Sequence, residues 1–157
     1  MIFMEELTEK ERKIVEKRVR EKAKWPRGYA TREFLREKGI SLEEYFRRTE
    51  TEKILFHSLI QSFERGESCE GVVQSSYIKI LSALNKGTRS SKTLHRFVWK
   101  EYVSVNPLLK ELKRYGLIEV DSKMSRGYRY RLTRKGKRFL AWLYEQKEFN
   151  YIPESLN

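Results

Sequence analysis

The chain contains very few of the side chains on which disulfide-stapled, metal-bound or catalytic proteins depend. Among its 157 residues there are two histidines, one aspartate and a single cysteine, Cys69. One cysteine cannot form an internal disulfide or a site with several thiolate ligands, and the scattered acids offer no cluster for a nuclease-type metal site. We therefore predict no metal, no cofactor and no enzymatic activity, and we expect Cys69 to be a structural thiol.

Long apolar runs are also missing. No stretch approaches the roughly 18–20 apolar residues that a membrane-spanning helix needs. The opening MIFMEELTEK has acidic residues where a signal peptide would have its apolar core. We expect a cytoplasmic protein with no membrane partner. The acids are 21 Glu against one Asp, while Asn and Gln together number seven, a bias that is typical of proteins from thermophiles.

Positive charge is abundant and unevenly distributed. The formal net charge is +12, yet residues 1–71 hold 16 Lys and Arg against 15 acids, whereas residues 72–157 hold 18 against 7. A localised excess of this size predicts a polyanion as the partner of the second half. We therefore divide the chain into residues 1–70, for dimerisation or partner docking, and a basic domain over residues 71–157.

Helical periodicity dominates the first half. We predict helices over 5–24, 30–38, 42–48 and 50–65, with Ser41 capping the third and Thr49 capping the fourth. Helices 30–38 and 42–48 around a glycine turn would fit a DNA-binding helix-turn-helix. An ordinary helical hairpin fits better, because this half carries no excess positive charge.

In the second half the hydrophobic period changes from helical to alternating. Serines at 75–76 and 90–91 begin two helices, the second continuing through Phe97 and Val98, and a third spans 104–115. Strands at 117–121 and 128–132 form a hairpin, and Thr133 caps a last helix over 134–147. The predicted fold is mainly α with a small β-hairpin wing, a winged helix-turn-helix domain preceded by a helical N-terminal region.

Two segments resemble winged helix-turn-helix regulators of the MarR and PadR kind. Residues 105–118, VNPLLKELKRYGLI, resemble their recognition helix and first wing strand, in which an apolar ladder leads into Leu-x-x-x-Gly-Leu-Ile. Residues 130–136, YRLTRKG, resemble their second wing strand, Tyr-x-Leu-Thr-x-x-Gly. The resemblance covers residues 74–145 and implies a homodimeric transcriptional regulator that binds double-stranded DNA, from a thermophilic archaeon or one of its viruses or plasmids.

The predicted DNA-binding surface combines three groups of side chains. On helix 104–115, Ser104 and Asn106 would meet base edges in the major groove, where Asn can pair with adenine. The hairpin 121–131 would act as a basic wing on the backbone or in the minor groove, and cations around the second helix would hold phosphates. The predicted residues are Lys86, Arg89, Lys92, Arg96, Ser104, Asn106, Pro107, Lys110, Lys113, Arg114, Lys123, Arg126, Arg129 and Arg131.

Other functions remain open at this point. A plasmid or viral replication or partition protein would use the same DNA-binding surface, and the residues do not separate it from a transcriptional regulator. A winged helix that serves as a protein-interaction module is disfavoured, because it would not need the localised charge. A small-molecule effector fits a regulator, but no residue selects one. We expect Trp99 and Trp142 in the core or an interface rather than stacked on bases.

Overall fold

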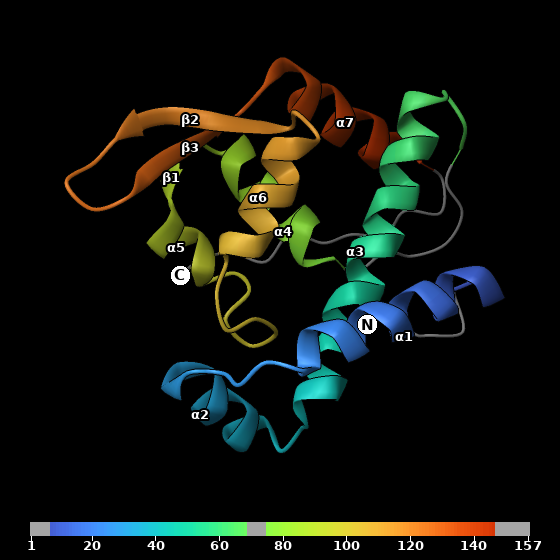
Figure 1. Ribbon diagram of the computed structural model, residues 1–157. Helices are drawn as coiled ribbons and strands as arrows, with labels where there is room; N and C mark the ends of the chain where they lie inside the picture. The colour runs from blue at the N-terminus through green and yellow to red at the C-terminus, as the bar shows by residue number, and fades with distance from the viewer. Residues whose placement is uncertain (1–6, 69–74, 147–157) are drawn as a thin grey trace. The chain divides into compact units, whose positions relative to one another are not determined.

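The computed structural model describes residues 7–68 and 75–146, and within them the chain forms seven helices and one three-stranded antiparallel sheet (Figure 1). The chain divides into two compact units, Met1–Leu59 and Ile60–Asn157. Both Cys69 and the boundary predicted at residues 70 and 71 lie outside the described residues.

The first unit consists of α1 (Glu9–Ala23), α2 (Tyr29–Lys38) and most of α3 (Leu42–Glu64). Thr8 and Glu11 form a capping box that starts α1, which satisfies two backbone donors that a helix start leaves open. The apolar stripe of α1 is buried as a small core, which contains Leu7, Val15 and Val19, with Phe46, Ile54 and Leu55 packed against them.

Helix α3 is continuous where two helices were predicted, at 42–48 and 50–65, so that prediction was wrong. The Thr49 hydroxyl donates to the carbonyl oxygen of Phe46 at 3.4 Å, one turn back in the same helix, instead of capping a new one. No glycine or proline interrupts residues 42–64. Because Glu50 and Thr51 are also buried, packing favours the helix through the predicted break. Ser41 does cap α3, accepting from the backbone N–H of Glu44 at 3.0 Å.

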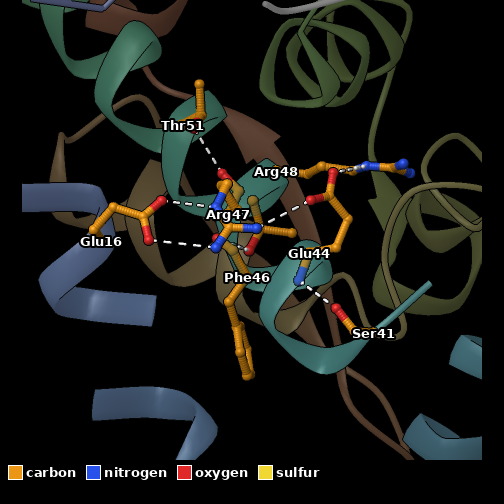
Figure 2. A network of polar contacts seen from close by, with 8 residues as sticks. Glu16, Ser41, Glu44, Phe46, Arg47, Arg48 and Thr51 are labelled. Carbon is orange, nitrogen blue, oxygen red and sulfur yellow. Dashed lines mark hydrogen bonds and ion pairs between the residues drawn. The ribbon is translucent and has the colours of Figure 1, made fainter. Parts of the chain in front are cut away.

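Ion pairs join α1 to α3 (Figure 2). Two nitrogens of the Arg47 guanidinium donate to the two carboxylate oxygens of Glu16, at 2.7 and 3.3 Å, and a third donates to Glu44 at 3.1 Å. The buried carboxylate of Glu50 is paired with Arg18 and Lys22 of α1. A buried carboxylate needs such partners, because an isolated charge away from water is strongly destabilising.

The pairing with Arg47 makes the stability of this unit pH-dependent. Hydrogen bonding from Arg47, and then its positive charge, lower the pKa of Glu16 below the ordinary glutamate value. A lowered folded-state pKa means that the stabilisation is present above the unfolded-state pKa, about 4.3, and is lost as the pH falls through the folded-state value.

We expect the Glu16→Gln variant to lose less stability on acidification than the wild type does. Urea unfolding midpoints measured from about pH 6 down to about pH 3 check this, because that range spans the ordinary pKa of about 4.3 and extends below it, where the stabilisation is lost. Glu21→Gln, an exposed glutamate on the same helix, is the matched control and should follow the wild type. Parallel curves for the wild type and Glu16→Gln would contradict the assignment.

The second unit is built on a sheet with strand order β1-β3-β2. In chain order it contains α4 (Ser76–Asn85), β1 (Arg89–Ser90), α5 (Ser91–His95), α6 (Asn106–Arg114), β2 (Ile118–Lys123), β3 (Tyr128–Leu132) and α7 (Arg134–Glu145). Hydroxyls of Ser75, Ser90 and Thr133 cap α4, α5 and α7 by accepting backbone N–H groups. The predicted starts of α4, α5 and α7 and the hairpin are therefore confirmed, whereas α6 begins at Asn106, two residues later than predicted.

Several element boundaries differ from the prediction. The sequence does not predict β1, because two residues are too short to show an alternating pattern; this strand exists through its pairing with β3. Strand β2 continues to Lys123, with an irregular register between Val120 and Ser122. Helix α5 ends at His95, so the predicted helical positions of Phe97 and Val98 were wrong and both lie in turns. The predicted helix end at residue 147 lies outside the described residues.

The core of the second unit comes mainly from α4, α6 and α7. Phe63, near the end of α3, packs edge-to-face on Phe139 of α7 with ring centroids 5.3 Å apart. Trp142 lies beside both rings, as expected for a core residue. Burying side chains of this size is the main favourable term in folding. The fully buried side chains include Ile78, Ile80, Leu81, Leu108, Leu112, Phe139, Leu140 and Leu143.

One tight junction joins the α6–β2 turn to the start of α7. The Thr133 hydroxyl donates to the carbonyl of Gly116 at 2.6 Å and accepts the N–H of Gly136 at 3.0 Å. The Thr133 N–H donates to the carbonyl of Leu117 at 3.0 Å. Gly116 has φ +74°, which glycine adopts without strain. A Cβ added at Gly136 would lie 2.2 Å from the Leu117 oxygen, so this position excludes every larger residue unless the backbone moves.

Gly136→Ala should therefore lower the free energy of unfolding by at least about 1–3 kcal/mol, the usual cost of overpacking. Urea denaturation followed by circular dichroism measures it. Gly28→Ala is the matched control, because nothing lies within 4 Å of a Cβ at that position; as an N-cap change it should cost less than about 1 kcal/mol. Equal losses of unfolding free energy in the two variants would show that the close approach to Leu117 does not restrict the size of the side chain at position 136.

Candidate nucleic-acid interface

Helix α6 has one buried face and one exposed face. Its buried positions are Leu108, Leu109, Glu111 and Leu112, and Val105 just before the helix is buried as well. The exposed positions are Asn106, Pro107, Lys110, Lys113 and Arg114. This separation follows the helical period, because residues three or four apart share a face.

The start of α6 places its polar side chains at the surface. Asn106 is the first residue of the helix and is exposed, and Pro107 lies in the first turn, where its missing N–H removes no helical hydrogen bond. Ser104 is half-buried, and its hydroxyl accepts the backbone N–H of Asn106 at 3.2 Å. Ser104 therefore supports the helix start, while the Asn106 amide faces solvent.

The three cations of α6 have different surroundings. Arg114 donates to the carboxylate of Glu111 at 2.7 Å and lies over the ring of Tyr115; the hydrogen bond to Glu111 raises the pKa of Arg114. Lys110 and Lys113 have no ion-pair partner within the described part of the chain. The two lysines are therefore the cations of α6 that are available to an external anion.

The four predicted cations of the hairpin also differ in their surroundings: two have partners within the unit and two are exposed. Arg129 is half-buried and donates to the hydroxyl and the carbonyl oxygen of Thr88 at 3.1–3.3 Å. Arg131 pairs with Glu119 at 2.9 Å and Asp121 at 3.4 Å, and the pairing with Glu119 raises its pKa. Lys123 and Arg126, at the end of β2 and in the turn, are exposed.

The remaining predicted cations lie around β1 and α5. Lys86, Lys92 and Arg96 are exposed, whereas Arg89 is half-buried on β1 and its Nε has no hydrogen-bond partner among the described residues. The wing is close to this region: β1 pairs with β3 (Figure 1), and a Cβ at Gly127 would lie 3.6 Å from the Ser91 hydroxyl. The structure thus joins the wing and the start of α5, and it brings Arg129 to the segment before β1.

Sequence reasoning did not assign two exposed features of this unit. The side chain of Trp99, between α5 and α6, is 53% exposed, so it is not a core residue; the alternative expectation, an interface, stays a prediction. Arg134, Lys137 and Arg138 of α7 are exposed cations on the first two turns of that helix. Their spacing of three and four residues could have identified this second basic face, because such positions lie side by side on a helix.

The described residues contain no group of three or more His, Cys, Asp or Glu side chains that could hold a metal ion. Among the described helices, none combines the length and the apolar composition that crossing a lipid bilayer requires. No protein-family model, curated protein or solved structure matches the chain.

Arg126 and Arg129 of the hairpin test the distinction between a cation that is exposed and one that is hydrogen-bonded within the unit. Arg129→Gln should lower the free energy of unfolding by about 1–2 kcal/mol, because it removes charged hydrogen bonds to Thr88. The matched variant Arg126→Gln should change the free energy of unfolding by no more than about 0.5 kcal/mol, as other surface substitutions do. Chemical denaturation measures both. A stability loss in Arg126→Gln as large as in Arg129→Gln would contradict the assignment.

Proposed function

We propose that the protein binds double-stranded DNA sequence-specifically and acts as a homodimeric transcriptional regulator with a winged helix-turn-helix domain. The observation that carries the proposal is the exposed face of α6, with Asn106, Lys110 and Lys113 outward over a buried leucine ladder. A helix with an apolar inner face and outward donors can enter the major groove. The order of elements from α4 to α7 supports the same proposal.

The charge of the second unit favours DNA over a protein partner. Residues 75–146 contain 17 Lys and Arg against five acids. Three of those acids, Glu111, Glu119 and Asp121, are paired with arginines of the same unit. Lys110 and Lys113 have no ion-pair partner in the described ranges, and the DNA backbone supplies a regular array of charges that could neutralise them.

The internal contacts refine the role of each residue in the proposal. Asn106, at the start of α6, reads base edges, while Lys110 and Lys113 hold phosphates on either side of the groove. Lys123 and Arg126 of the wing contact the backbone. Arg114, Arg129 and Arg131 mainly shape the surface, because each already has an internal partner.

Selection of bound duplexes from a random pool tests the proposal, followed by titration of the selected duplex over a salt series. We expect a palindrome with half-sites about 10 base pairs apart, as a dimer requires, and an affinity that falls steeply with salt. Lys113→Ala should weaken binding to all duplexes and reduce the salt slope by about 1. Asn106→Ala should reduce the preference for the selected duplex by about 1–3 kcal/mol.

Lys17→Ala is the matched control, because Lys17 is an exposed lysine of α1 in the other unit and should leave duplex affinity unchanged. Duplex binding that does not depend on salt would refute the proposed surface. So would an equal loss of duplex affinity in Lys17→Ala and Lys113→Ala. A selected site with a single, unrepeated element would refute the homodimer.

A further inference from the structure

Residues 24–29, which form the connection after α1 and the first residue of α2, expose two aromatic rings. Trp25 is 69% exposed and Tyr29 is 72% exposed, the highest values among the large apolar side chains of the described residues. Tryptophan and tyrosine are enriched where proteins bind partners, because each combines a large apolar surface with a polar group. Two such rings, four residues apart in the sequence, make this segment a candidate binding surface.

The connection is fastened to the body of the first unit. Arg27, between the two rings in the sequence, donates from Nη2 to the carbonyl of Lys22 at 2.6 Å. Its guanidinium lies over the ring of Phe46 on α3, 4.8 Å from the centroid. Pro26 further restricts the backbone. The exposed rings therefore flank an anchored residue, which reduces the entropy that a partner would have to remove on binding.

The segment that carries the two rings is basic and lies between Glu21 and Glu33 in the sequence. Residues 22–32 contain four Lys and Arg and no acid. Lys22 is paired with Glu50, but Lys24 and Arg32 are exposed and have no ion-pair partner in the described ranges. If two copies met through this same patch, like charges would face one another. The patch therefore fits an anion better than a second copy of the chain.

We propose that residues 24–29, together with Arg32, bind single-stranded DNA. Unpaired bases stack on the rings of Trp25 and Tyr29, while Lys24 and Arg32 contact the phosphates, the combination by which proteins hold single strands. Duplex DNA does not offer these base faces, because its bases are stacked on one another. The patch lies in the first unit, and the inference goes beyond the duplex binding proposed for the second.

The full-length chain is titrated against a labelled oligothymidylate of about 20 nucleotides, long enough for several single-strand contacts, with fluorescence anisotropy as the readout. The double variant Trp25→Ala/Tyr29→Ala should bind it at least about tenfold more weakly, as loss of stacked bases predicts. Trp25→Phe should retain most of the affinity, because it keeps an aromatic face. Tyr144→Ala, an exposed aromatic of α7 outside the wing, is the matched control and should bind normally.

A crossed comparison separates this inference from the proposed function. Lys110→Ala/Lys113→Ala should lose duplex affinity and keep oligothymidylate affinity, and Trp25→Ala/Tyr29→Ala should show the reverse. If the wild type binds the duplex but the aromatic double variant binds oligothymidylate like the wild type, the single-strand site is wrong while duplex binding stands. The single-strand site would also be wrong if Trp25→Ala/Tyr29→Ala lost duplex and oligothymidylate binding together. It would be wrong as well if the patch bound anionic phospholipid vesicles in preference to oligothymidylate.

Discussion

The contact between the start of α7 and the turn after α6 is the constraint on which the basic unit depends. The Thr133 hydroxyl bridges the carbonyl of Gly116 and the N–H of Gly136, and Lys135 donates to the carbonyl of Tyr115 at 2.9 Å. These bonds fasten the end of α6 to the point where β3 leads into α7. The direction of α6 relative to the hairpin is thereby fixed, and with it the placement of the outward face of α6.

Internal ion pairs then decide which cations of that unit remain available. Arg114 and Arg131 are held by acids and Arg129 by Thr88, so the exposed face of α6 and the wing turn present mainly Lys110, Lys113 and Arg126 outward. Arginine suits such internal roles because its planar guanidinium makes several directed hydrogen bonds at once. The net charge of a surface therefore does not show which of its cations are already paired within the protein and which face solvent.

The first unit uses its charges differently. Glu16 and Glu50 are matched by arginine and lysine on the facing helix, so a nearly equal number of acids and bases becomes an internal network around a small apolar core. The exception is the basic segment between α1 and α2, where the cations have no acids among them and two aromatic rings remain exposed.

Features that depend on neighbouring residues could be predicted from the amino-acid sequence. It predicted the caps Ser41 and Thr133 and the hairpin, because a cap or a turn is decided within about one helical turn of chain. Three features could not be predicted in this way: the pairing of β1, the continuity of α3 and the bond from Arg129 to Thr88, 41 residues away. Contacts between residues so far apart leave no local pattern, because the fold alone brings them together.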